Sequence, residues 1–320
     1  MSGASGALMG QKRFDLSFLK KNIAIILLIV LVVFNCIFTK NFMSWVTFSN
    51  LFMQASKIAL IGLGMTLVIA TGGIDISVGS AMAVGATISA IFFAQGDYWG
   101  VLISIAIVAG FGLLAGTLVS KFAIIPMIAT LALRYIMRGM AQGVSGVGTV
   151  SYSAPELTQA FTTPVGGIFP LHFFILVAAA VFMYFLVNRM KFGSQVEAYG
   201  NNPTAAKICG INTVKIVILC YVAIAIFSWG SGMIDMIMVS SADPSKLGVD
   251  MEIDVIAATV IGGTPITGGY PNIIGTVCGA FSLQLITMMC NMNNVAYSIT
   301  LMIKAAIIVF ALFFHGFRKK

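Results

Sequence analysis

Runs of apolar residues long enough to cross a lipid bilayer recur along this whole chain. An α-helix needs about 17–25 predominantly apolar residues to cross the hydrocarbon core. The 320 residues contain ten candidate ranges, the eighth only about half that length: 23–39, 50–71, 77–95, 99–120, 125–143, 170–187, 213–234, 252–262, 273–290 and 296–314. The runs are continuous rather than alternating, which excludes a transmembrane β-barrel. The sequence therefore predicts an all-α, polytopic membrane protein with about ten transmembrane helices.

The low content of charged residues supports this class. Charged residues make up 9% of the chain and hydrophobic residues 59%, with a mean hydropathy of +1.02. A soluble domain is about one quarter charged, so too few charges remain here to cover a water-facing surface. The five cysteines have no spacing typical of a metal site, and we interpret them as small buried apolar residues. No metal site is expected.

Basic residues are divided unequally between the two sides of this layout. If the N-terminus is cytoplasmic, the cytoplasmic segments hold twelve of them: Lys12, Arg13, Lys20, Lys21, Lys121, Arg189, Lys191, Lys207, Lys215, Arg318, Lys319 and Lys320. The outer segments hold two, Lys40 and Lys246. Because Lys and Arg are enriched in cytoplasmic loops, both termini are predicted to be cytoplasmic. The net charge of +8 follows from this topology and does not indicate nucleic-acid binding.

The same layout predicts a single domain embedded in membrane lipid. It consists of a cytoplasmic N-terminal segment 1–22, one transmembrane domain 23–314 and a basic cytoplasmic tail 315–320. The longest cytoplasmic loop lies at about 188–212. Every loop is short, so no soluble domain is expected.

Two glycine-rich segments echo each other at a shift of 190 residues. TGGIDISVG (71–79) aligns with IGGTPITGG (261–269), and each follows one apolar run and precedes another. Paired interruptions of this kind are typical of broken helices at a transport pathway, while the alternative is two ordinary cytoplasmic turns. Neither segment contains Lys or Arg, which favours partial burial. The candidate residues are Gly72, Gly73, Asp75, Ser77, Gly79, Gly262, Gly263, Thr264, Thr267, Gly268 and Gly269.

Asp75 is the most unusual residue of the first segment. A carboxylate inside the bilayer costs at least about 2.5–3.5 kcal/mol, so it usually has a functional role or a paired cation. The structural alternative is that Asp75 or Ser77 caps the helix that starts at Val78. The sequence leaves both interpretations open, and they are compatible.

Several other charges fall within or near the predicted spans. Arg134 and Arg138 are four residues apart and so share a helix face. They either pair with carboxylates or carbonyls of the protein or line a polar pathway. Asp254, near the start of the eighth span, has Lys304 or one of these arginines as a candidate partner.

The cytoplasmic loop contains signals for a very short helix. Asn202 is a suitable N-cap, Pro203 fits the first helical position, and Gly210 can end the helix. This pattern predicts about two turns, from Pro203 to Cys209. Because so short a helix is marginal in water, it must pack on something. It is either an interfacial linker or a docking element for a soluble partner.

Three motifs in order resemble the permease subunits of ribose-, xylose- and galactose-type ABC importers: GMTLVIATGGIDISVGS, GNNPTAAKICGI and EIDVIAATVIGGTPITGG. The similarity extends over essentially the whole chain. It implies a multi-pass protein of the bacterial cytoplasmic membrane and a coupling helix that docks on an ATPase subunit. The residues assigned to coupling are Gly200, Asn201, Asn202, Pro203, Ala205, Ala206 and Gly210.

The resemblance also implies the partners. ATPase subunits would bind ATP and Mg²⁺, a periplasmic or lipid-anchored binding protein would deliver the solute, and a second permease copy or close paralogue would complete the pathway. The chain has no G-x-x-x-x-G-K-[ST] loop and no evident nucleophile–base pair, so it is not expected to be an enzyme or to bind a cofactor. Thr204, the Tyr270–Pro271 pair and Arg134 depart from the family pattern, which bears on the substrate and the cytoplasmic contacts.

Other functional classes remain as alternatives. A self-sufficient secondary transporter or channel would account for the intramembrane charges and the broken helices, but it has no need of a cytoplasmic docking helix. A membrane scaffold would not explain the two glycine-rich interruptions. Within the importer class, the substrate is a monosaccharide or related polar molecule, with a nucleoside as the alternative.

Overall fold

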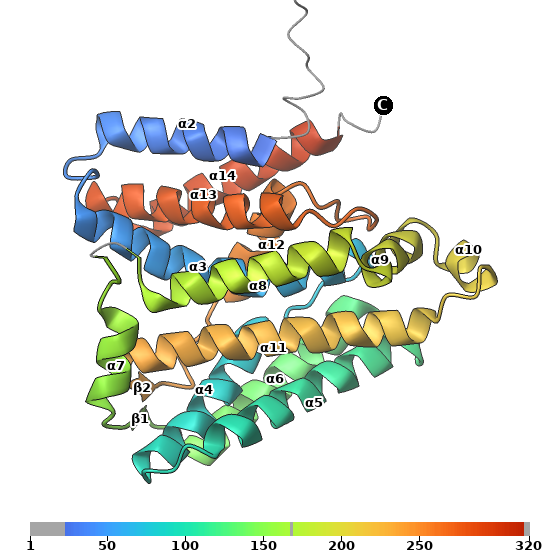
Figure 1. Ribbon diagram of the computed structural model, residues 1–320, viewed down its shortest axis with the longest axis horizontal. Helices are drawn as coiled ribbons and strands as arrows, with labels where there is room; N and C mark the ends of the chain where they lie inside the picture. The colour runs from blue at the N-terminus through green and yellow to red at the C-terminus, as the bar shows by residue number, and fades with distance from the viewer. Residues whose placement is uncertain (1–22, 167–168, 317–320) are drawn as a thin grey trace, which may run out of the picture.

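The computed structural model describes residues 23–166 and 169–316, and over these residues the chain is almost entirely helical (Figure 1). The longer helices are α2 (Ile23–Phe38), α3 (Trp45–Ala70), α4 (Val78–Ala94), α5 (Gly100–Ser120), α6 (Pro126–Ser145), α8 (Leu171–Asn188), α11 (Thr213–Val239), α13 (Ile273–Met292) and α14 (Tyr297–Gly316). The shorter ones are α7 (Pro155–Thr162), α9 (Lys191–Asn201), α10 (Pro203–Ile208) and α12 (Met251–Ile261). The predicted N-terminal segment 1–22 lies outside the described residues, as does most of the tail.

Helices occupy all ten of the apolar ranges. Five of them, α3, α5, α8, α11 and α13, are long and apolar enough to cross a membrane, while α2, α4 and the apolar part of α14 are shorter. In Figure 1 the long helices run side by side, with α9 and α10 at one end of the bundle and α7, β1 and β2 at the other. The prediction of an all-α membrane protein is confirmed.

Helix α3 is the most buried of the five long apolar helices. Its residues from Ala55 to Ala70 are buried, and it packs against α11, α12 and α13. Small residues permit this close packing, as expected for helices that associate without a hydrophobic driving force. A β-carbon on Gly64 would lie 2.5 Å from the α-carbon of Ile224 in α11, so these two backbones touch.

The end of the bundle that carries α7 is closed by a small two-stranded sheet. Strand β1 (Val150–Ser151) pairs antiparallel with β2 (Ser241–Ala242), and Tyr152 donates to the carbonyl oxygen of Met236. The long loop after α6 is thereby tied to the end of α11. The sequence patterns did not predict these strands or α7.

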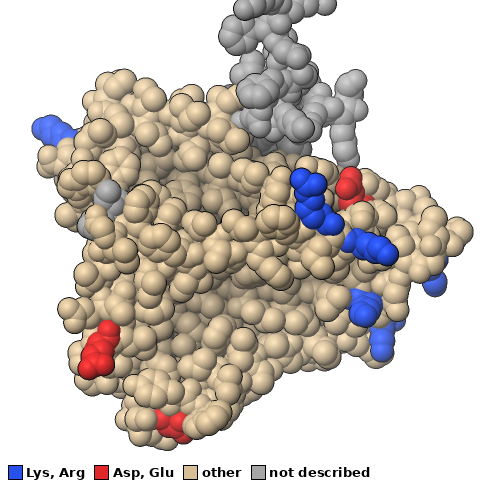
Figure 2. Space-filling view, in the orientation of Figure 1, with Lys and Arg blue, Asp and Glu red and all other residues tan. Residues whose placement is uncertain are grey.

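The exposed charges differ between the two ends of the bundle. On the face shown in Figure 2, most basic side chains gather at the end that bears α9 and α10, and the middle of the molecule is free of charge. The exposed basic residues near that end belong to the predicted cytoplasmic segments: Lys121, Arg189, Lys191, Lys207 and Lys215. Because Lys and Arg are enriched in cytoplasmic segments, this distribution agrees with the predicted orientation, in which the α10 end faces the cytoplasm.

Candidate translocation and coupling site

Both glycine-rich segments interrupt helices. Helix α3 ends at Ala70 and α4 begins at Val78, while α12 ends at Ile261 and α13 begins at Ile273. We call residues 71–77 the first break and residues 262–272 the second break. Gly72 and Gly263 have φ angles of +79° and +95°, a region that glycine enters without the steric cost of a β-carbon.

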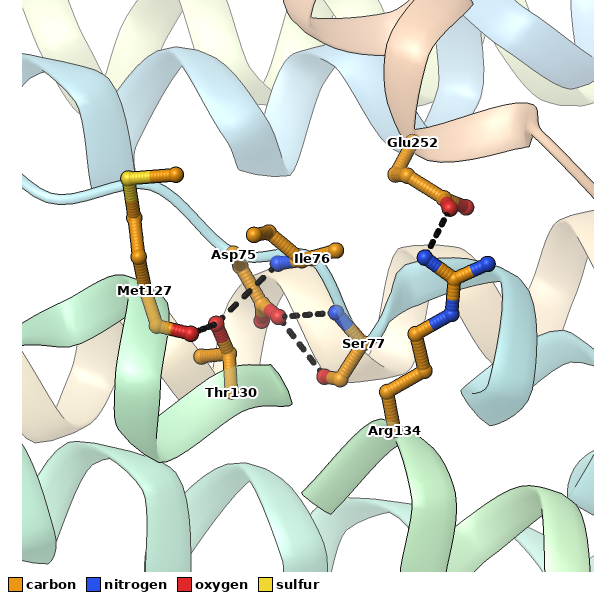
Figure 3. A network of polar contacts seen from close by, with 7 residues as sticks. All are labelled: Asp75, Ile76, Ser77, Met127, Thr130, Arg134 and Glu252. Atoms are coloured by element: carbon orange, nitrogen blue, oxygen red, sulfur yellow. Dashed lines mark hydrogen bonds and ion pairs between the residues drawn. The ribbon is translucent and has the colours of Figure 1, made fainter. Parts of the chain in front are cut away.

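In the first break, Asp75 closes the turn that precedes α4 (Figure 3). Its Oδ1 atom accepts the backbone N–H of Ser77 across 2.7 Å and the hydroxyl of Ser77 across 2.6 Å, and the side chain is buried. Ser77 is the N-cap residue of α4, but its side chain makes no capping hydrogen bond. The expectation that Ser77 caps the helix was wrong, because its hydroxyl acts as a donor to Asp75.

Helix α6 holds the same break in place. The backbone N–H of Ile76 donates to the hydroxyl oxygen of Thr130 across 3.2 Å, and this hydroxyl in turn donates to the carbonyl oxygen of Pro126. In the described part of the chain, none of the cations Arg134, Arg138 and Lys304 forms an ion pair with Asp75. The carboxylate therefore serves the local turn.

The two arginines of α6 both contact the segment that leads into α12. Arg134 forms an ion pair with Glu252, which lies in the first turn of α12 and is buried. Arg138 donates from one nitrogen to the carbonyl oxygens of Pro244 and Leu247, at 2.7 and 2.8 Å. Sequence reasoning missed Glu252, although an acidic residue at the start of a half-length span was a usable signal.

Two further ion pairs connect the helices. Lys304 of α14 donates to both carboxylate oxygens of Asp254 at 3.0 Å, which selects one of the partners left open by the sequence. Lys57 of α3 contacts Asp235 of α11 across 2.6 Å. Each pair lies between helices distant in sequence, so the charges in these predicted spans are compensated within the chain.

The second break is organised by Asn272. Its side-chain nitrogen donates to the carbonyl oxygen of Gly262 across 2.8 Å, and its side-chain oxygen accepts the N–H of Gly275 to cap α13. Thr264 accepts the backbone N–H of Asn272 across 3.1 Å. Thr267 and Gly268 lie in the same loop. The sequence analysis did not single out Asn272, which connects the two ends of this break.

The predicted short cytoplasmic helix is present as α10. Asn202 accepts the N–H of Ala205 across 3.0 Å as its N-cap, Pro203 is the first helical residue, and Gly210 follows with a φ of +80°. The helix ends at Ile208, one residue before the expected end. The preceding helix α9 was not predicted. Its residue Tyr199 is partly buried, and this burial raises the pKa of the Tyr199 hydroxyl.

The end of α9 touches the second break and the last residue of α3, which leads into the first break. The N–H of Gly269 in the second break donates to the carbonyl oxygen of Ala70 at the end of α3, across 2.8 Å. Gly200, in the last turn of α9, lies against this hydrogen bond. Segments that the sequence analysis assigned to two different roles, translocation and coupling, are thus in direct backbone contact.

A family of membrane transport proteins matches this chain over residues 47–312, which is most of its length. The family is described as the permease component of the branched-chain amino acid transport system. The chain belongs to this permease family.

Curated relatives are similar over a comparable length. The permease is 30% identical over 309 residues to the ribose import permease RbsC of Escherichia coli, covering 94% of this chain and 95% of that one. It is 38% identical over 236 residues to the galactofuranose transporter permease YtfT of the same organism, covering 72% and 68%. It is 31% identical over 278 residues to the fructose import permease FruF of Bifidobacterium longum, covering 82% and 78%. No solved structure matches the chain.

These findings confirm the resemblance to the permease subunits of sugar ABC importers. The permease is a multi-pass protein of the bacterial cytoplasmic membrane. Within the described residues, no group of His, Cys, Asp or Glu side chains could hold a metal ion.

The permease also has a pocket of about 490 Å³ at the end of the bundle that carries α7. It is lined by Tyr152, Ser153, Ala154, Pro155, Thr158, Gln159, Thr162 and Ser240. The hydroxyls of Thr158 and Ser240 are hydrogen-bonded at 2.7 Å, and burial raises the pKa of Tyr152 to about 12. The lining residues carry no charge, and no sequence pattern pointed to this pocket.

Proposed function

We propose that this permease is the transmembrane subunit of an ABC importer that translocates a monosaccharide or related polar molecule into the cytoplasm. The observation that carries the proposal is the contact of the end of α9 with the second break and with Ala70, which leads into the first break. A solitary carrier needs no exposed cytoplasmic helix, whereas a subunit driven by a separate ATPase needs one that reaches the transport pathway. The names of the relatives, which include ribose, galactofuranose and fructose import permeases, support the sugar substrate.

In this proposal the ten predicted ranges all cross or enter the membrane, with both termini in the cytoplasm. The first and second breaks flank the pathway, since backbone that is not helical is tolerated at membrane depth only where protein or water satisfies its polar groups. The coupling residues 200–210 contact the ATPase subunit. The candidate pathway residues are Gly72, Gly73, Asp75, Ser77, Gly79, Gly262, Gly263, Thr264, Thr267, Gly268 and Gly269.

The partners follow from the class. Two ATPase domains bind ATP and Mg²⁺ and dock on α10, so the permease itself performs no catalysis. A periplasmic or lipid-anchored binding protein delivers the solute from the opposite side, and a second copy or close paralogue completes the pathway. ATP binding closes the ATPases, and α10 converts this motion into a change at the two breaks.

The test is uptake by reconstituted proteoliposomes. The purified permease is inserted alone or with the ATPase and binding protein of its transport system, and radiolabelled ribose, galactose, fructose, leucine and adenosine are supplied. We expect uptake of one sugar that requires ATP and both partners. Uptake by the permease alone under a proton or sodium gradient would instead establish a secondary transporter, and ATP-driven uptake of leucine or adenosine would correct the substrate class.

A further inference from the structure

Three segments that are distant in sequence meet at one backbone hydrogen bond. Gly269 donates its N–H to the carbonyl oxygen of Ala70 across 2.8 Å. A β-carbon on Gly200 would overlap this carbonyl and would lie 2.5 Å from the nitrogen of Gly269. Only a residue without a side chain therefore fits between α9 and the hydrogen bond.

Gly268 lies against the same three segments. Its φ is +86°, and a β-carbon there would lie 2.9 Å from the carbonyl oxygen of Gly200 and 3.1 Å from the backbone nitrogen of Gly72. The second break thus lies directly against the backbones of α9 and the first break. We call the five residues Ala70, Gly72, Gly200, Gly268 and Gly269 the Gly200 junction.

The junction is separated from α10 by only two residues, and hydrogen bonds hold the connection. Asn201 is the last residue of α9, and its side-chain oxygen lies 2.9 Å from the position of a β-carbon on Gly269. Asn202 donates its N–H to the carbonyl oxygen of Ala198 and caps α10. Pro203 then fixes its own φ angle. A displacement of α10 therefore reaches Gly200 through a short connection anchored at both ends.

We infer that the Gly200 junction is the positioning element that transmits the movement of α10 to both breaks, so that the breaks move together. The inference rests on the proposed importer function and names the residues through which the ATPases act. Contacts between flexible side chains could absorb a small displacement by changing rotamer. Here the contacts are between backbones, and closely packed groups transmit a displacement to their neighbours.

The substitution Gly200→Ala tests this inference, because one added methyl group separates Ala70 from Gly269. ATPase binding by the variant is measured first, and loss of binding would assign Gly200 to the docking surface and overturn the inference. The sugar transported per ATP hydrolysed should fall by about tenfold or more, the consequence of a typical overpacking strain at the coupling step. Gly110→Ala is the matched control, because a β-carbon there would meet no atom within 4 Å. A wild-type transport ratio in an assembled Gly200→Ala complex would overturn the inference.

A second measurement needs no variant and so does not depend on folding of Gly200→Ala. Amide hydrogen exchange is followed at Gly269 in the wild-type permease alone, in the nucleotide-free complex and in the complex with a non-hydrolysable ATP analogue. Because the junction moves as a unit, we expect this amide to stay protected in all three states. Rapid exchange in any of them would contradict the inference. Failure of the wild-type complex to transport with ATP would instead refute the proposed function.

Discussion

Arg134 of α6 forms an ion pair with Glu252 at the start of α12, and the carboxylate of Glu252 also lies beside the start of α4. A β-carbon on Gly79 would be 3.2 Å from this carboxylate. The positive end of the α4 dipole and the guanidinium of Arg134 therefore both stabilise the buried negative charge. Because the pair spans α6 and α12, it secures the half-length helix that leads to the second break.

Removal of one partner of this pair should destabilise the permease strongly. Arg134→Gln leaves Glu252 buried without a cation, at a cost on the order of 3 kcal/mol. The double variant Arg134→Gln/Glu252→Gln should recover most of the loss, because no charge then remains unpaired. Thermal unfolding of the purified protein in detergent measures the stability of the single and the double variant.

The surface pair of Lys246, which is exposed, and Asp243, which is half-buried, provides the control. Because Lys246 is exposed to solvent, Lys246→Gln should change the free energy of unfolding by less than about 1 kcal/mol. Equal stability of Arg134→Gln and wild type would show that the ion pair contributes nothing to the packing of α12.

Substitution of Asp75 distinguishes a turn residue from a required charge. Asparagine retains the side-chain oxygen that accepts the N–H of Ser77, so Asp75→Asn should support uptake close to wild type. Asp75→Leu leaves the Ser77 amide buried without a partner, which costs about 1–3 kcal/mol and should abolish uptake. Uptake by each variant is measured in proteoliposomes. Loss of uptake in a stable, assembled Asp75→Asn complex would make the negative charge itself part of the pathway.

The sequence predicted the features that repeat along the chain. Continuous apolar runs located the long helices, and the 190-residue echo located both breaks. Helices and glycine-rich breaks both depend on residues that are neighbours in the sequence. Asn202 and Pro203 likewise specified the start of α10 through local geometry.

Features that depend on distant segments could not be predicted in this way. The packing of the helices decides that Arg134 pairs with Glu252 and Lys57 with Asp235. The sequence alone offered several cations as equally suitable partners. The contact of Gly200 with Ala70 depends on the position of α9, whose polar composition provided no clear helical signal. Tertiary packing therefore decides which charges pair and which glycines allow close approach.

Selective thiol labelling tests the proposed topology. Gln159→Cys places an exposed thiol in α7, at the end predicted to face outward, while Cys209 is an exposed native thiol beside α10. In intact spheroplasts a membrane-impermeant maleimide should label the introduced α7 thiol of this variant, and Cys209 should react only after permeabilisation. The background should carry Cys36→Ser, because Cys36 is also exposed. The opposite labelling order would invert the layout.

Ala206 and Ile208 of α10 are predicted to have different roles in coupling. Ala206 is only 4% exposed and packs against the permease itself, whereas Ile208 is 81% exposed and is free to contact a partner. An exposed apolar side chain on a helix of six residues is a natural anchor for a groove of the ATPase. Ile208→Asp should therefore weaken ATPase binding by about tenfold or more, since a charge would enter an apolar contact without a partner.

The binding constant of the ATPase for the purified permease measures this effect directly. Ser194→Asp is the control, because it places the same charge at an exposed position of α9, outside α10. It should leave ATPase binding within about twofold of wild type, as expected for a surface substitution away from the contact. Ala206→Glu should instead lower the thermal stability of the permease, because the charge would be buried within its own fold. Wild-type ATPase affinity in a folded Ile208→Asp variant would show that α10 does not dock through this side chain.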